Sequence, residues 1–211
     1  MPRTKDQDAR LANLESQLGV YQRISRLMVS ELSLSETLQA VVRLVSEFTD
    51  CDSCLVYLIE GNELVLCASS NPHPLEIGRV RLKLNEGLTG WVARERRMLA
   101  IPSEAYKDSR FKSFSNLQED SFEAFLSVPV IARNRVIGVI NVQHKLARRY
   151  PGSEMEMITT VGEQVGCLLA LARLSPTAVE EANHVELVRQ AGHIEARFQR
   201  RPDAEGGSGK A

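Results

Sequence analysis

Hydrophobic positions follow two kinds of repeat along the 211-residue chain. Spacings of three and four residues indicate amphipathic helices, whereas alternation by two indicates half-buried strands. Helical spacing covers residues 6–32, a segment that follows "LSLSE" and ends near Phe48, residues 154–174 and residues 177–200; strand-like runs cover 53–60, 63–69, 79–84, 98–102 and 124–145. Consecutive strands joined by tight turns predict a mainly antiparallel sheet and therefore an α+β fold.

The first predicted helix carries a narrow apolar stripe. Its members recur by threes and fours, with Ser25 as the only polar residue among them: Leu11, Leu14, Leu18, Tyr21, Met28 and Leu32. A stripe this narrow is typical of a helix that pairs with another helix. We therefore expect residues 1–32 to form an amphipathic dimerisation helix and the chain to form a homodimer.

Several residues suggest where the other helices begin and end. Ser35 is a candidate N-cap for the second helix, and Ser153 with Glu156 forms a candidate capping box for the long helix. Pro176 should end that helix, because a proline ring disfavours helix at the preceding residue. Residues 175–200 are then expected to form a C-terminal output helix, and the tail 201–211 to be disordered.

The first strand pair is apolar on both faces. A turn at residues 61–62 would pair Glu60 with Glu63 and Val56 with Cys67. That register places one group on each face: Cys54, Val56, Leu58, Val65 and Cys67 on the first, and Leu55, Tyr57, Ile59, Leu64, Leu66 and Ala68 on the second. Both faces must therefore be covered, one by helices and the other by residues 86–123.

Three segments in order, "NEGLTGWVARERRMLAIP", "DSRF" and "LSVPVIARNRVIGVINVQ", resemble a GAF domain. The resemblance covers roughly residues 20–174, and we assign 33–174 as the domain. "GLTGWV" keeps Gly87, Gly90 and Trp91, and the final hairpin keeps Pro129 and Gly138. The resemblance implies a six-stranded antiparallel sheet, with helices on one face and short helices and loops over a small-molecule pocket on the other. It also implies a sensory input module of a longer signalling system.

The segment 103–123 offers the candidate ligand-binding residues. It is polar with scattered aromatic residues, which suits a small-molecule site. The candidates are Tyr106, Asp108, Arg110, Phe111, Ser113, Phe114 and Phe122, with Ser127 and Tyr57 as weaker candidates on strands. Arg110 would anchor an anionic group. The alternative is that Asp108 and Arg110 pair with each other while the phenylalanines seal the core.

The cysteines in "CDSC" are expected to be packing residues. A redox thiol sits at a helix N-terminus, whereas Cys51 follows a helix and has Asp50 and Asp52 beside it. A zinc site needs further ligands at suitable spacing, and none of the four histidines pairs with another. A redox or metal sensor built on Cys51, Cys54 and Cys67 stays open as an alternative. No cofactor is predicted.

The pocket-covering segment lacks the chemistry of the enzymatic and chromophore-binding GAF types. Reduction of free methionine-R-sulfoxide and bilin attachment use cysteines there, and this chain has none between Cys67 and Cys167. The phosphodiesterase-type Asn-Lys-Phe-Asp-Glu signature is missing, and His73 and His144 are expected to be solvated instead of binding haem. We therefore expect no enzymatic activity.

Charge and hydropathy limit the possible binding partners of the protein and its location. The formal net charge is −1, with 26 basic and 27 acidic residues, so nothing favours nucleic acid. The N-terminus lacks an apolar signal core, and no run is long enough to span a bilayer, which predicts a cytoplasmic protein. The sequence thus predicts a non-catalytic sensory module that binds a small molecule and acts on a separate signalling protein. The alternative is a structural dimerisation module with a filled pocket.

Overall fold

The computed structural model describes residues 5–73, 75–114 and 117–172. Six strands form one sheet in the order β3-β2-β1-β6-β5-β4, and every neighbouring pair is antiparallel. The strands are β1 Ser53–Glu60, β2 Glu63–Ser69, β3 Arg81–Lys83, β4 Leu99–Ile101, β5 Ala124–Ala132 and β6 Arg135–His144. The expected α+β class and six-stranded antiparallel sheet are confirmed. The predicted C-terminal helix 175–200 and the tail 201–211 lie outside the described residues.

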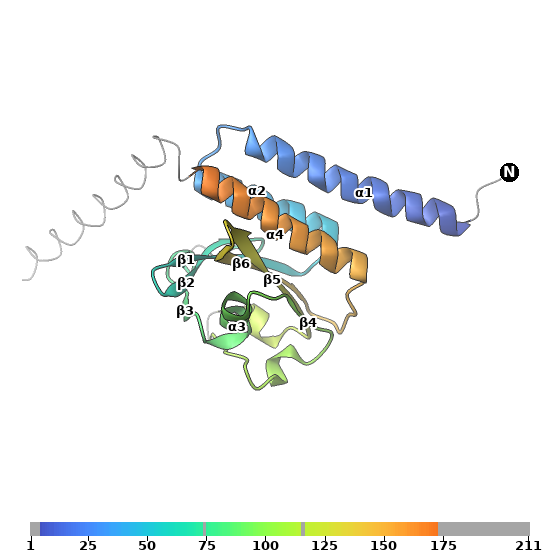
Figure 1. Ribbon diagram of the computed structural model, residues 1–211. Helices are drawn as coiled ribbons and strands as arrows, with labels where there is room; N and C mark the ends of the chain where they lie inside the picture. Colours follow the sequence, from blue (N-terminus) through green and yellow to red (C-terminus); the bar gives the residue numbers. More distant parts are fainter. Residues whose placement is uncertain (1–4, 74, 115–116, 173–211) are drawn as a thin grey trace, which may run out of the picture. The chain divides into compact units, whose positions relative to one another are not determined.

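Helices cover one face of the sheet (Figure 1). α2 (Leu34–Thr49) and α4 (Gly152–Ala172) lie over β1, β6 and β5, and together they form the larger hydrophobic core. α1 (Lys5–Met28) packs on α2, where Val20 and Ile24 are buried in that same core. Of the apolar stripe expected on α1, Leu11, Leu14, Leu18 and Tyr21 are exposed, whereas Met28 packs against that core.

The opposite face is covered by short elements. α3 (Gly87–Glu95) and two 3-10 turns, Ala105–Lys107 and Gln118–Ser121, lie there, and a second core cluster forms beneath them around Tyr57, Leu66, Val92 and Val139. We call the described residues of 103–123 the lid. Two differently covered faces are what the sequence predicted.

Two glycines bring α4 into close contact with strand β5. A Cβ placed on Gly162 would lie 2.7 Å from the Pro129 carbonyl oxygen, and one on Gly166 would lie 2.0 Å from the Ile131 carbonyl oxygen. Real side chains do not reach such distances, so the backbone of α4 can rest on the strand only because both positions lack a side chain.

Some predicted boundaries are wrong. The N-cap of α2 is Ser33, not Ser35, and its side chain accepts from the backbone N–H of Glu36 in a capping box. α4 begins at Gly152, so Ser153 lies inside its first turn and is not the cap. α1 ends at Met28, so Leu32 lies outside the helix. β3 spans only Arg81–Lys83, the centre of the strand predicted over 79–84.

The predicted register of the first hairpin holds only near its turn. Glu60 pairs with Glu63 as expected, but an irregularity between Val56 and Tyr57 makes Val56 pair with Ala68 instead of Cys67. Ala68 consequently joins the helix-side core, opposite to its predicted face. A bulge shifts every later residue of one strand by one position, and alternation alone cannot locate it.

Replacing Gly166 tests the close contact between α4 and β5. Gly166→Ala should lower the free energy of unfolding by roughly 1–3 kcal/mol, because the added methyl group overlaps the Ile131 carbonyl and the helix must shift. Gly19→Ala on α1 is the matched control. It meets nothing within 4 Å, so helix propensity should leave stability unchanged or raise it by up to ~1 kcal/mol. Urea unfolding followed by circular dichroism measures both, and equal effects would contradict the contact.

Candidate functional site

Strand β6 supplies a polar floor beneath the lid. Its residues alternate: Ile140 and Val142 face the helices, whereas Asn141 and Gln143 face the other side. Asn141 lies opposite Ser127 of β5, and Gln143 lies opposite Ser53 of β1. Asn141 is 2% exposed and Gln143 is 6% exposed. Buried amides on an otherwise apolar sheet need hydrogen-bond partners, which makes this face a candidate site.

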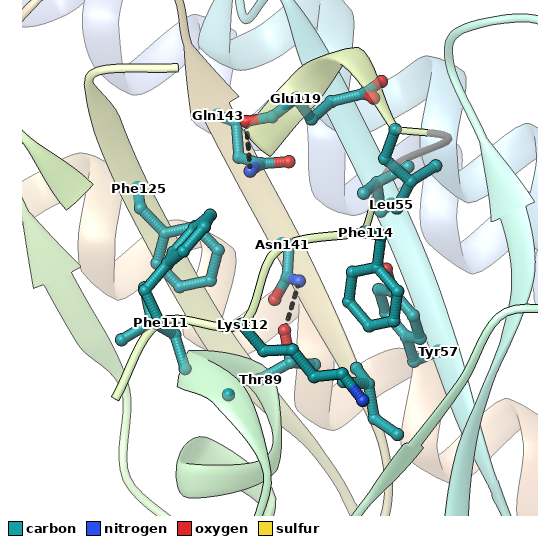
Figure 2. Close-up of a pocket in the computed structure, with 14 residues that line it drawn as sticks. Leu55, Tyr57, Thr89, Phe111, Lys112, Phe114, Glu119, Phe125, Asn141 and Gln143 are labelled. Atoms are coloured by element: carbon teal, nitrogen blue, oxygen red, sulfur yellow. Dashed lines mark hydrogen bonds between the residues drawn. The ribbon is translucent and has the colours of Figure 1, made fainter. Parts of the chain in front are cut away.

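Asn141 has partners on two neighbouring elements. Ser127 Oγ donates to Asn141 Oδ1 at 2.7 Å. Asn141 Nδ2 donates to Thr89 Oγ1 at 2.8 Å (Figure 2). The three residues are buried. This chain of hydrogen bonds fixes the first turn of α3 against β5 and β6, so this end of the site is preorganised.

Aromatic side chains stand around the floor. Figure 2 shows Phe111 and Phe114 of the lid on opposite sides of Asn141, with Tyr57 and Phe125 of the sheet behind them. The space that they leave is about 30 Å³, which is room for one or two water molecules. Pockets for metabolites are about ten times larger or more. The lid is therefore closed down on the floor.

Glu119 forms the second polar group of the site. Its carboxylate is 1% exposed, and Oε1 lies 2.8 Å from His73 Nε2, 2.8 Å from Asn71 Nδ2 and 3.0 Å from Ser53 Oγ. These contacts tie the lid to β1 and to the loop after β2. Burial acts to raise the pKa of Glu119, but hydrogen bonds with His73 and Asn71 outweigh it and leave that pKa below its ordinary value. Glu119 is thus a buried carboxylate at neutral pH.

Only some of the predicted site residues line the cavity. Phe111, Phe114 and the weaker candidate Tyr57 line it directly. Ser127 lies one hydrogen bond away, behind Asn141. Phe122 is buried but does not line the cavity, and neither does Tyr106, which is 38% exposed and donates to Glu123.

Asp108 and Arg110 pair with each other. The Arg110 guanidinium donates to both carboxylate oxygens of Asp108, at 2.8 and 2.7 Å, and that hydrogen bond lowers the pKa of Asp108. Arg110 also lies over the Trp91 ring, 4.8 Å from its centroid. Arg110 and Trp91 line a surface hollow that adjoins the cavity and shares Gly87, Phe111 and Lys112 with it. This geometry matches the alternative given by the sequence, in which Asp108 and Arg110 pair with each other and fix the loop.

Five polar or charged lining residues were not predicted: Thr89, Lys112, Glu119, Asn141 and Gln143. The alternation in "VINVQ" already contained the signal for two of them, because polar residues at every second position of a strand with a buried opposite face must lie together. Glu119 sits in a segment without any repeat, so no pattern could have identified it.

The prediction that His73 and His144 are solvated is wrong. His73 is held by Glu119, and His144 is 6% exposed in a cluster at the helix-side end of β6. Arg148 Nη1 donates to His144 Nε2 at 2.5 Å, and the same guanidinium donates to the Thr49 carbonyl and to Glu154. Burial and the Arg148 charge hold the pKa of His144 below its ordinary value. This cluster links the end of α2 to the start of α4.

All four cysteines are unpaired. Cys54 is buried in the helix-side core, where burial raises the pKa of its thiol well above the ordinary value; burial also raises the pKa of Cys51 and of Cys67. Protonated, buried thiols act as packing residues. No group of three or more metal-ligating side chains occurs among the described residues. The helices of that same part of the chain include none that is long and apolar enough to cross a bilayer.

Comparisons with known sequences agree with this fold. A family profile described as GAF domain matches residues 33–169. The chain is 29% identical over 147 residues to a "Phosphoenolpyruvate-dependent phosphotransferase system" protein of Escherichia coli (strain K12), which covers 67% of this chain and 19% of that protein. It is 24% identical over 193 residues to a "Nif-specific regulatory protein" of Azospirillum lipoferum, covering 88% and 30%. The chain thus spans less than a third of either relative.

Solved structures give the same result. The GAF domain of an Acinetobacter phosphoenolpyruvate-protein phosphotransferase superposes with a TM-score of 0.66 at 29% identity, covering 75% of this chain and 95% of that one. A free methionine-R-sulfoxide reductase from Neisseria meningitidis, solved with its substrate, has a TM-score of 0.63 at 14% identity, covering 75% and 90%. The second likeness shows the fold alone.

Trp91 is the single tryptophan of the chain and can report on the Arg110 contact. Arg110→Ala should change the emission maximum or intensity of Trp91, because the guanidinium no longer covers the indole. Stability should change by only about 1 kcal/mol or less, since the pair is partly exposed. Arg94→Ala, at the edge of the same hollow, is the control and should leave the emission unchanged. Identical spectra for wild type and Arg110→Ala would contradict the stacking.

Proposed function

This chain belongs to the GAF domain family, a regulatory fold, and we propose that it is a non-catalytic cytoplasmic sensor that binds a small molecule between its lid and its sheet. The observation that carries the proposal is the buried polar floor. Asn141 and Gln143 lie beneath aromatic side chains on the face covered by the lid. A face that served only for packing would be expected to be apolar, as the helix-side face is.

Strand β6 offers a route from the ligand to the helices. Asn141 and Gln143 face the cavity, while Ile140 and Val142, their immediate neighbours, pack under α2 and α4. A ligand that moved the floor would therefore move residues in the helix-side core. The Arg148 cluster adds a second link, because it joins Thr49 at the end of α2 to Glu154 at the start of α4. We propose that ligand binding shifts the population of two arrangements of these helices.

The signal would pass to a separate signalling protein through a homodimer. The stripe Leu11, Leu14, Leu18 and Tyr21 remains exposed although the other face of α1 packs on α2. An apolar stripe on one helix suits the same stripe on a second copy. Relatives named as a phosphotransferase-system protein and as Nif-specific regulators support a regulatory role for this domain.

A structural module without a ligand is the second candidate. The free space of about 30 Å³ favours it, because Phe111, Phe114 and Leu117 already occupy most of the room beneath the lid. The two candidates differ in one respect. A sensor requires the lid to open at low cost, whereas a filled scaffold requires it to stay packed as firmly as the sheet.

Hydrogen exchange separates these candidates. We expect the lid amides of Phe111, Leu117 and Phe122 to exchange with opening free energies well below that of global unfolding, because each donates only within a local turn. The amides of Val139 and Ile140 in the central strand should exchange only near the global limit. Residue-resolved NMR exchange measures both sets. Equal protection of the lid and the sheet would favour the filled scaffold.

Replacing the exposed stripe tests the dimer. Leu18→Asp should shift the protein from dimer to monomer, because Leu18 is 56% exposed in the stripe and a carboxylate cannot be buried there without a partner. Val29→Asp is the control: Val29 is 84% exposed but lies beyond the end of α1. Sedimentation analysis gives the mass of each variant. A wild type that is monomeric at high concentration would contradict the dimer.

A further inference from the structure

Two side-chain oxygen atoms of residues that line the cavity have no hydrogen-bond partner among the described residues. Four buried side-chain atoms share this property, and two of them belong to cavity-lining residues: Glu119 Oε2 and Gln143 Oε1. An unpaired buried acceptor is destabilising, and a charged one more so. We propose that these two acceptors bind the ammonium head of a small organic cation. The inference rests on the proposed function, because it names the ligand class of the same cavity.

The orientation of the Gln143 amide follows from its surroundings. Its Nε2 donates toward the Glu119 backbone carbonyl, at 3.5 Å. The reverse orientation would place two oxygens against each other. The side-chain oxygen therefore points to the other side, and Figure 2 shows the amide between Phe125 and Leu55, above Asn141. The unpaired group of Gln143 is thus an acceptor, and not a donor.

Both free groups at this end of the cavity are acceptors, so they select a donor. The three hydrogen bonds of the Glu119 carboxylate all go to Oε1, which leaves Oε2 available. An ammonium group has three N–H donors and no acceptor, and its charge complements the carboxylate. Hydrogen bonds between charged groups are about twice as strong as neutral ones. A water molecule can donate to the same oxygens, but it does not supply the opposite charge.

The other charged residue that lines the cavity does not favour an anion. Lys112 Nζ lies 2.6 Å from Glu86 Oε1, and it also lies over the Phe114 ring, 5.1 Å from its centroid. Its charge is thus already paired at the surface. The hydrogen-bonding groups of Asn141 are likewise occupied, by Ser127 and Thr89. The unfilled capacity of the site is therefore concentrated at Glu119 and Gln143.

The apolar part of the ligand would lie between Phe111 and Phe114. The present space of about 30 Å³ holds little more than the head group, so a longer ligand must displace these two rings and with them the lid. Head-group binding and lid displacement then occur together. This links the ligand class to the opening on which sensing depends.

Three probes of equal length test the ligand class: butylammonium, butanol and butyrate. Isothermal titration of the 211-residue chain should show binding of butylammonium about tenfold or more tighter than butanol, and no binding of butyrate, because only the ammonium pairs with Glu119. Glu119→Gln keeps the shape of the side chain and should remove that preference. Glu63→Gln is the control with the same change of charge; Glu63 lies on β2, outside the cavity.

Gln143→Met provides a second variant, should Glu119→Gln fail to fold. It removes the other acceptor and should weaken butylammonium binding while circular dichroism remains unchanged. Equal or tighter binding of butyrate, or binding of butylammonium that survives both variants, would overturn the ligand class but leave the sensor proposal standing. If none of the three probes binds to a protein whose lid amides exchange readily, the ligand class is likewise overturned and the sensor proposal stands. Failure in a protein whose lid is as protected as the sheet would overturn both.

Discussion

Strand β6 has to be buried on both faces, and the rest of the domain depends on how that requirement is met. Ile140 and Val142 lie under α2 and α4, whereas Asn141 and Gln143 lie under the lid, so one strand separates an apolar core from a polar site. Apolar residues need only be covered, but buried amides must also be hydrogen-bonded. The lid side therefore needs partners at defined positions, and Ser127 and Thr89 supply them for Asn141.

The two coverings are held by different forces. On the helix side, Gly162 and Gly166 let the backbone of α4 rest on β5, a contact that any side chain would displace. On the other side, a few polar contacts join the lid to the rest of the domain: Glu119 with its three partners, and Lys112 with Glu86. Close packing resists small displacements, whereas single hydrogen bonds exchange readily with water. The lid is therefore the part of the domain suited to motion.

Sequence patterns predicted the fold well and the site only in part. Alternation and turn residues predicted the strands, a mainly antiparallel sheet and the turn at residues 61–62, and the resemblance to GAF domains implied six antiparallel strands. They failed at the irregularity after Val56, because a bulge leaves no trace in the spacing of apolar residues. Phe111 and Phe114 were found from composition, but Glu119 was not, since its partners His73, Asn71 and Ser53 come together only through the tertiary fold. Arg110 was predicted to anchor an anionic group because of its charge, but its guanidinium is paired with Asp108.

The two ends of the site differ in whether their polar side-chain atoms have hydrogen-bond partners. At one end both polar atoms of Asn141 are hydrogen-bonded, and that end fixes α3 to the sheet. At the other end Glu119 and Gln143 keep free oxygens, and Glu119 belongs to the lid itself. A ligand bound there would satisfy the lid and the floor together, so it would stabilise one position of the lid relative to β6. Since the reverse face of β6 lies in the helix core, the lid and the helices α2 and α4 contact the same strand, and this shared strand is the route that the proposed sensor would use.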